Sequence, residues 1–168
     1  GGANTTAANN TFVGANAGLL NSTGTGNTFM GKGAGDANTT AHDNTFIGTD
    51  AGGSNVTGTG NTFLGTAAGD VNTASANTFL GGANTSAADN TFIGTNAGLL
   101  NVTGVSNTFI GARAGDSNTA SGNTFIGKDA GGANTAGTLN TFIGSNSGAG
   151  NSTSTKNTFV GASSGQVN

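Results

Sequence analysis

Three aspartates come closest to forming a metal site, both by residue type and by spacing. Asp36, Asp70 and Asp116 each follow an Ala-Gly pair, so they occupy one equivalent place in a repeated unit. Calcium in proteins takes about six to eight oxygen ligands, usually including several carboxylates. One aspartate in each of only three units does not supply that number. We interpret these residues as turn formers, and we expect no bound metal and no cofactor.

Groups for acid–base or nucleophilic catalysis are also scarce. His42 is the one histidine, it lies in a variable stretch beside Asp43, and the chain has no cysteine and no glutamate. A serine nucleophile needs a histidine base that a third group orients, and no second element of this sequence offers such a set. We expect His42 to be an exposed turn residue and the protein not to be an enzyme.

Charge and composition exclude two further classes of partner. The net charge is −3, and the four basic residues are scattered along the chain: Lys32, Arg113, Lys128 and Lys156. A nucleic-acid-binding surface needs clustered lysine and arginine, and a membrane-spanning helix needs about 20 consecutive apolar residues. Since the sequence has neither, we expect no nucleic-acid partner and no membrane insertion.

The chain is built on a repeat of Asn-Thr-Phe-aliphatic-Gly, and this repeat must set the places of all the remaining residues. Successive phenylalanines are 16 or 17 residues apart, except for one gap of 13. All ten lie in copies of the repeat: Phe12, Phe29, Phe46, Phe63, Phe79, Phe92, Phe109, Phe125, Phe142 and Phe159. Identical residues in a fixed register are the signature of a repeat architecture. We number the repeat from its first Asn, so that Gly is invariant at position 5 and Asn at position 12.

This period predicts an all-β fold, a parallel β-solenoid (β-helix or β-roll) of about ten 17-residue coils. Helix is disfavoured because each glycine costs about 1 kcal/mol in a helix interior, whereas short Thr-Phe-Ile runs between Asn and Gly are typical of strands. We treat residues 1–168 as a single repeat array with one shortened coil at 77–89. Neither end has a distinct capping sequence, which solenoids need, so we expect either a segment of a longer solenoid or a solenoid that a partner caps.

The repeated Asn and Gly predict the corners of each coil. Asn tolerates the left-handed turn conformation, and stacked Asn amides can bond from coil to coil. Gly at positions 5 and 9 is expected where φ is positive. Glycosylation sequons of the form Asn-x-Thr/Ser occur at Asn4, Asn21, Asn38, Asn55, Asn84, Asn101 and Asn151. We interpret these sequons as by-products of the corner Asn.

One of the two apolar rows in the strands must point outward. Phe and the aliphatic residue after it are neighbours, and neighbours in a strand face opposite sides. Phe inside is favoured because the rest of the repeat is too small to fill a coil, although the opposite arrangement stays open. With Phe inside, the outward stripe consists of Thr at position 2 and the aliphatic residue at position 4: Thr11, Val13, Thr28, Met30, Thr45, Ile47, Thr62, Leu64, Thr78, Leu80, Thr91, Ile93, Thr108, Ile110, Thr124, Ile126, Thr141, Ile143, Thr158 and Val160.

Such a stripe predicts a partner, since soluble monomers rarely leave a large apolar patch bare. In one hypothesis the stripe packs against the same stripe of two other chains, which gives a homotrimeric, non-enzymatic structural or adhesive fibre module. In the alternative hypothesis the stripe is a Thr-rich plane that binds ice. The stripe could also pack against another part of the parent protein.

The motif Asn-Thr-Phe-Ile-Gly-x-x-Ala-Gly-x-x-Asn-Thr-Thr-Gly resembles repeats of large bacterial and phage surface fibre proteins. Its Asn-x-x-x-Ile-Gly part also resembles the head repeats of trimeric autotransporter adhesins, which form left-handed β-rolls and associate as trimers. The resemblance covers essentially the whole chain. It implies an extracellular place on a cell surface or virion, a homotrimer, and an unknown host-surface or glycan receptor. The period of 17 is longer than the adhesin head repeat and Phe replaces a smaller residue, so no ligand site carries over.

Overall fold

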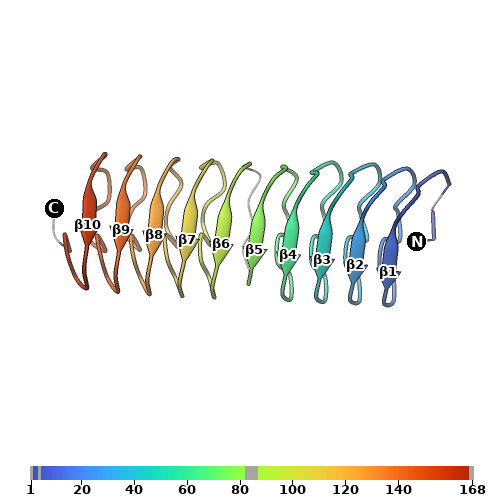
Figure 1. Cartoon of the computed structure of the whole chain (residues 1–168), viewed down its shortest axis with the longest axis horizontal. Helices are drawn as coiled ribbons and strands as arrows, with labels where there is room; N and C mark the ends of the chain where they lie inside the picture. Colours follow the sequence, from blue (N-terminus) through green and yellow to red (C-terminus); the bar gives the residue numbers. More distant parts are fainter. Residues whose placement is uncertain (1, 4, 82–86, 167–168) are drawn as a thin grey trace. The chain divides into compact units, whose positions relative to one another are not determined.

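The computed structural model describes residues 2–3, 5–81 and 87–166. Its secondary structure consists of strands of three residues, and no helix occurs among the described residues. The strands are β1 (Thr11–Val13), β2 (Thr28–Met30), β3 (Thr45–Ile47), β4 (Thr62–Leu64), β5 (Thr78–Leu80), β6 (Thr91–Ile93), β7 (Thr108–Ile110), β8 (Thr124–Ile126), β9 (Thr141–Ile143) and β10 (Thr158–Val160). The predicted parallel β-solenoid is therefore confirmed (Figure 1).

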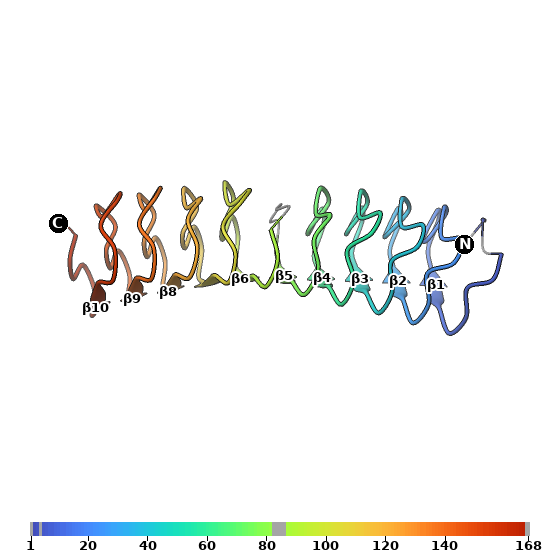
Figure 2. The same cartoon turned by 90° about the horizontal axis from the view of Figure 1, so that it is seen from above.

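The chain divides into two compact units, residues 1–86 and 87–168. The boundary falls inside the shortened copy at 77–89, of which residues 82–86 lie outside the described part of the chain. The first unit carries β1 to β5 and the second carries β6 to β10. Within each unit the strands follow one another along one side of the coils, and the turns occupy the other side (Figure 2).

Within each unit, every strand pairs in parallel with the next one and residues of the same repeat position lie beside each other. In the first unit Phe12 pairs with Phe29, and the same register holds from β2 to β5. In the second unit Phe92 pairs with Phe109, and the register holds from β7 to β10. The 16-residue copies that follow β4 and β7 keep this register because the deletion falls in the turns.

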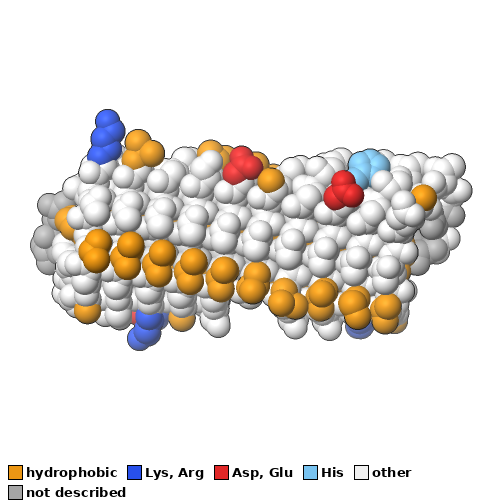
Figure 3. All heavy atoms as spheres, viewed as in Figure 1, with side chains coloured by type: hydrophobic (Ala, Val, Ile, Leu, Met, Phe, Trp, Pro, Cys, Tyr) orange, Lys and Arg blue, Asp and Glu red, His pale blue; other side chains and the backbone are white. Residues whose placement is uncertain are grey.

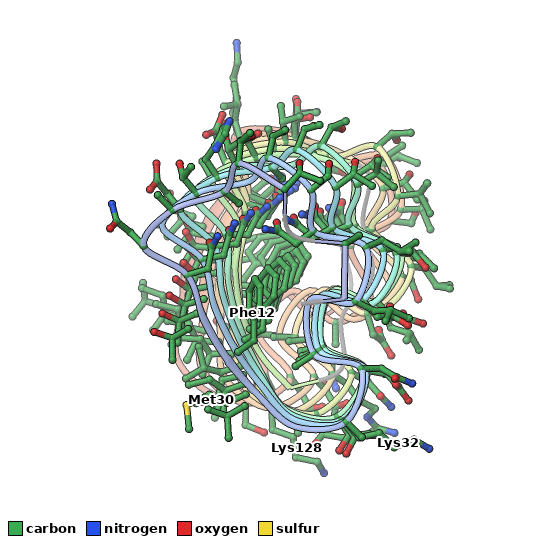
Figure 4. The ribbon with its side chains drawn as sticks, turned by 90° about the vertical axis from the view of Figure 1, so that its right-hand side faces the viewer. Phe12, Met30, Lys32 and Lys128 are labelled. Atoms are coloured by element: carbon green, nitrogen blue, oxygen red, sulfur yellow. The ribbon has the colours of Figure 1, made fainter. Side chains whose placement is uncertain are left out.

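The phenylalanines form the core of each unit. Successive rings are stacked, with centroids 4.7–5.0 Å apart and interplanar angles of 5–13° in the first unit. In the second unit the spacing is 4.9–5.0 Å and the angles are 4–12°. This spacing matches the rise of about 4.8 Å per stacked strand. Figure 4 shows the Phe12 ring pointing into the coil, so the structure decides that the Phe row faces inward.

Glycine at position 9 makes room for each ring. A Cβ placed on Gly35 would lie 2.6 Å from the Phe29 ring, and the backbone there has a φ of 57°. Both the space and the left-handed conformation therefore require glycine at this corner. The expectation of positive φ at positions 5 and 9 is confirmed at Gly31 and Gly35, with φ of 144° and 57°.

Among the described residues, the asparagines at positions 1 and 12 form two polar rows inside the coils, and all of them are buried except Asn10 and Asn157, which are half-buried. The Nδ2 of Asn38 donates to Oδ1 of Asn21 at 2.7 Å, and the backbone N–H of Asn44 donates to Oδ1 of Asn27 at 3.0 Å. Coil-to-coil amide bonding is thus confirmed. The left-handed conformation expected for these asparagines is wrong, because the described non-glycine residues with positive φ lie at positions 7 and 17, such as Asp50. The buried amides instead bond to carbonyl groups inside the coil.

Candidate functional site: the strand face

The outward face of the strands is the candidate functional surface, and we call the Thr at position 2 and the aliphatic residue at position 4 together the strand face. In the first unit Val13, Met30 and Leu64 are 52%, 42% and 45% exposed, while Ile47 and Leu80 are half-buried. Figure 3 shows these aliphatic side chains as a row along the strands, and Figure 4 shows Met30 pointing away from the coil interior. The structure therefore places the predicted stripe residues of this unit together on one surface.

The second unit has a more uniform strand face. Four successive strands, β6 to β9, have the same sequence Thr-Phe-Ile. Their isoleucines pair in register from Ile93 to Ile143, so each one lies beside the same side chain in the next coil. Ile110 and Ile126 are half-buried within this row. Strands β6 to β9 thus present one column of threonine next to one column of isoleucine, and β10 continues the aliphatic column with Val160.

Strand pairing explains why both columns are so regular. Side chains alternate between the two faces of a strand, and burial of the stacked Phe rings commits Thr and the aliphatic residue to the outside. A register slip by one residue would expose every Phe and bury every Thr. The buried Phe core therefore determines which residues of each strand form the strand face.

No charged side chain lies on the strand face. The four basic and seven acidic residues occupy only repeat positions 6, 7, 10 and 17, all in turns. Lys32 and Lys128, at position 6, extend from the turn that follows the strand (Figure 4). A face of this composition can bury its surface against a partner without removing any ion from water, which is costly unless the ion is paired.

The aspartates that could suggest a calcium site lie on the turn side. Asp36 and Asp70 flank Gly53, where an added Cβ would lie 2.7 Å from Oδ1 of Asp70. Partial burial, followed by the charges of Asp50 and Asp36, raises the pKa of Asp70 above its ordinary value. Burial is also the main cause that raises the pKa of Asp116. Among the described residues no group of three or more His, Cys, Asp or Glu side chains is placed to hold a metal ion.

One ion pair links neighbouring turns of the second unit. Nε of Arg113 donates to Oδ1 of Asp129 at 2.6 Å, and Nζ of Lys128 lies 3.5 Å from Oδ2 of the same aspartate. The hydrogen bond from Arg113 is the largest cause that lowers the pKa of Asp129. The arginine is largely exposed, so this pair contributes little to stability.

His42 is an exposed turn residue, as expected from its sequence context. Its Nδ1 accepts a hydrogen bond from the backbone N–H of Thr25 at 3.0 Å and lies 3.1 Å from the Thr25 hydroxyl oxygen. An acceptor Nδ1 implies that the ring proton is on Nε2. The histidine thus ties one turn to the turn of the preceding coil, and the described part of the chain contains no pocket beside it.

Two features of the surface were not apparent from the repeat alone. The pairs Leu19-Leu20 and Leu99-Leu100 are exposed at equivalent turn positions of the two units, and only the structure shows that they point to solvent.

Asn9-Asn10-Thr11 is a further sequon, and Asn9 is exposed at repeat position 17. A search for the Asn-x-Thr pattern, rather than for the Asn of position 12, would have found it.

Comparison with protein-family models, with curated proteins and with solved structures gives no match. A separate search of the described residues finds no helix of the length and hydropathy needed to cross a membrane. The strand face therefore has to be interpreted from its own geometry and composition.

Proposed function

We propose that this chain is a non-enzymatic structural or adhesive fibre module, placed extracellularly on a cell surface or virion, that self-associates through its strand face as a homotrimer. A host-surface or glycan receptor would be met elsewhere on the fibre. One observation carries the proposal: an uncharged, in-register face of threonine and bulky aliphatic side chains that the chain itself leaves uncovered. The resemblance of the repeat to those of surface fibre proteins supports the same function.

The interior of the described inner coils needs no partner chain, which limits what association can be for. In these coils the Phe rings stack, the small residues at position 8 are buried, and the Asn amides bond inside the coil. Folding of a coil is therefore complete within one chain. Association would bury the strand face, and its role would be to build a thicker shaft from finished solenoids.

The width of the strand face sets the strength of this association. A three-residue strand is about 10 Å long and each coil rises about 4.8 Å, so each coil offers about 50 Å² of face. The five strands of one unit offer about 250 Å², compared with about 800 Å² per partner in a typical stable interface. The strand face of one unit is therefore too small for a stable interface by itself. Since every coil adds buried area, we expect trimers to become tighter as coils are added.

Ice binding is the second candidate, and the second unit gives it a specific basis. The identical Thr-Phe-Ile strands β6 to β9 place a uniform isoleucine column beside a uniform threonine column, with no charge on either. A flat, regular surface of this kind is what a crystalline ligand would need. The first unit is less suited to ice, because Val13, Met30 and Leu64 differ in shape and stand out from the face.

A single charge on the strand face separates the two functions. We would introduce Ile93→Lys and compare it with Thr95→Lys, since Thr95 is an exposed turn residue at position 6, where Lys32 and Lys128 occur naturally. Light scattering over a concentration series measures mass, and ice-crystal shape with freezing hysteresis measures ice binding. The fibre module predicts trimers that Ile93→Lys dissociates and Thr95→Lys preserves, without any effect on ice.

The opposite outcomes are equally clear. A wild-type protein that stays monomeric at every concentration and shapes ice crystals, with hysteresis that falls in Ile93→Lys only, would replace the fibre proposal by ice binding. A monomer that leaves ice unchanged would refute both functions for the strand face. In either case the β-solenoid itself would stand.

A further inference from the structure

The glycosylation sequons of this chain lie in two different environments. At position 12 the acceptor Asn is buried in every described case, with side chains that are 0% exposed: Asn21, Asn38, Asn55, Asn101 and Asn151. The sequon Asn9-Asn10-Thr11 instead begins at an exposed Asn. Asn4 and Asn84 lie outside the described residues. From this contrast we infer that Asn9 is an N-glycan acceptor that the folded chain tolerates, whereas a glycan at position 12 and a closed coil exclude each other.

A glycan is excluded at position 12 because the side-chain amide of each described Asn there donates hydrogen bonds inside the coil. The Nδ2 of Asn38 donates to Oδ1 of Asn21 at 2.7 Å and also contacts the carbonyl oxygen of Ala41 at 3.3 Å. Nδ2 of Asn101 donates to the carbonyl of Gly104 at 2.8 Å. Glycosylation replaces one hydrogen of this nitrogen by a sugar. The coil interior, filled by Phe rings and stacked amides, has no room for a sugar ring. At Asn38, where Nδ2 has two acceptors, the replaced hydrogen would also leave one buried acceptor without its donor.

Asn9 occupies the corner before β1 and has the geometry of an accessible acceptor. Its backbone is left-handed, with a φ of 60°, which a short polar side chain tolerates. The third residue of its sequon, Thr11, is exposed at the start of β1. Sugar attached to the Asn9 side chain would extend into solvent beside the first strand. The buried amide rows of the following coils would keep all their hydrogen bonds.

The chemistry is transfer of an oligosaccharide from a lipid-linked pyrophosphate donor by an oligosaccharyltransferase of the host. A bond forms between Nδ2 of Asn9 and the anomeric carbon C1 of the first sugar. The bond between C1 and the lipid pyrophosphate breaks, the pyrophosphate leaves with the electron pair, and Nδ2 loses one proton. The same transfer at an unfolded position-12 Asn would trap that coil open, so the two classes of sequon have opposite consequences for folding. Neither self-association nor ice binding is needed for this difference.

Two matched chains secreted from a glycosylating eukaryotic host test the inference. In the first, every sequon except that of Asn9 is removed at its third residue, by Thr6→Ala, Thr23→Ala, Thr40→Ala, Thr57→Ala, Ser86→Ala, Thr103→Ala and Thr153→Ala. The second chain restores Thr40 and carries Asn9→Asp, so that only the Asn38 sequon remains. A control combines all seven substitutions with Asn9→Asp. The design leaves the buried amides intact, and Thr6, Thr23, Thr40, Thr57, Thr103 and Thr153 are exposed.

Glycopeptide mass spectrometry gives occupancy, while far-ultraviolet circular dichroism and protease resistance report the fold. We expect the first chain to carry a glycan on Asn9 and to match the control in spectrum and thermal midpoint. The second chain should be either glycosylated and protease-sensitive or folded and unglycosylated. Glycosylated Asn38 in a protease-resistant chain with the control spectrum would overturn the inference. Absence of glycan from Asn9, or loss of the fold when it is present, would also overturn it.

Discussion

Removing one ring from the middle of the phenylalanine stack should be among the most destabilising single changes in the second unit. The Phe109 ring is fully buried and stacks on Phe92 at 4.9 Å and on Phe125 at 5.0 Å. Phe-to-Ala changes in protein cores cost about 3–5 kcal/mol, and aromatic pairs add about 0.5–1.5 kcal/mol each beyond area burial. Because Phe109→Ala loses two stacked neighbours at once, we expect a loss near the upper end, about 4–5 kcal/mol.

The neighbouring residue provides the control. Ile110 is half-buried on the strand face, so Ile110→Ala removes side chain that is already partly in water, and we expect a loss of about 1 kcal/mol. Urea denaturation followed by circular dichroism measures both free energies of unfolding. Equal losses for the two variants, or a thermal midpoint of Phe109→Ala equal to that of the wild type, would refute the inward Phe core as the main source of stability.

Three further changes test the polar rows and the turns. Asn38→Ala should cost about 2–3 kcal/mol in chemical denaturation, because it leaves buried hydrogen-bond partners such as Oδ1 of Asn21 unsatisfied; a loss below that of Ile110→Ala would contradict this. Asp70→Asn should raise the thermal midpoint at neutral pH and have little effect well below pH 3.8. Burial and neighbouring aspartates raise the pKa of Asp70 in the folded chain, so the charged carboxylate destabilises the fold only as pH rises through the ordinary and then the folded pKa. An equal gain in thermal midpoint at both pH values would count against this reasoning. Leu139→Gly should stabilise by about 1 kcal/mol in the same denaturation assay, because Leu139 is an exposed residue held at a φ of 58°. The Leu139 side chain fills the space beside Gly122, and a destabilised variant would show that this packing outweighs the strain.

The buried Asn rows show which hydrogen bonds could be predicted from the sequence and which could not. Asn at two fixed positions correctly predicted bonding from coil to coil, since a repeated amide side chain has few other uses in an uncharged repeat. The sequence did not reveal that Nδ2 of Asn10 and Nδ2 of Asn21 both donate to the carbonyl oxygen of Gly24, at 2.7 Å and 3.0 Å. Position 15 varies between Gly, Ala and Ser, and the acceptor there is a backbone atom that no residue pattern records.

The corners of the coils show a second difference between what the sequence predicts and what the structure shows. Gly at position 9 was predicted to have positive φ, and Gly35 does. Position 7 also has positive φ, but it is occupied by residues as different as Asp50, Ala67 and Arg113, with φ of 55°, 53° and 58°. A left-handed corner can be imposed on such residues by the coils stacked above and below it. Local sequence therefore identifies only the corners where a Cβ has no space, beside the Phe ring at position 9 and against the backbone of the next coil at position 5.

By itself, the sequence determined the strand segments, their parallel register and the β-solenoid class, because Phe, Asn and Gly recur at a period that only stacked coils can satisfy together. It also determined that one of two adjacent apolar rows must face outward, because strand side chains alternate. Tertiary structure decided which row that is. The Phe29 ring is enclosed by the glycine corner at Gly35 and by Phe rings on both sides, and the resulting lack of space inside the coil leaves the threonine and aliphatic columns on the surface.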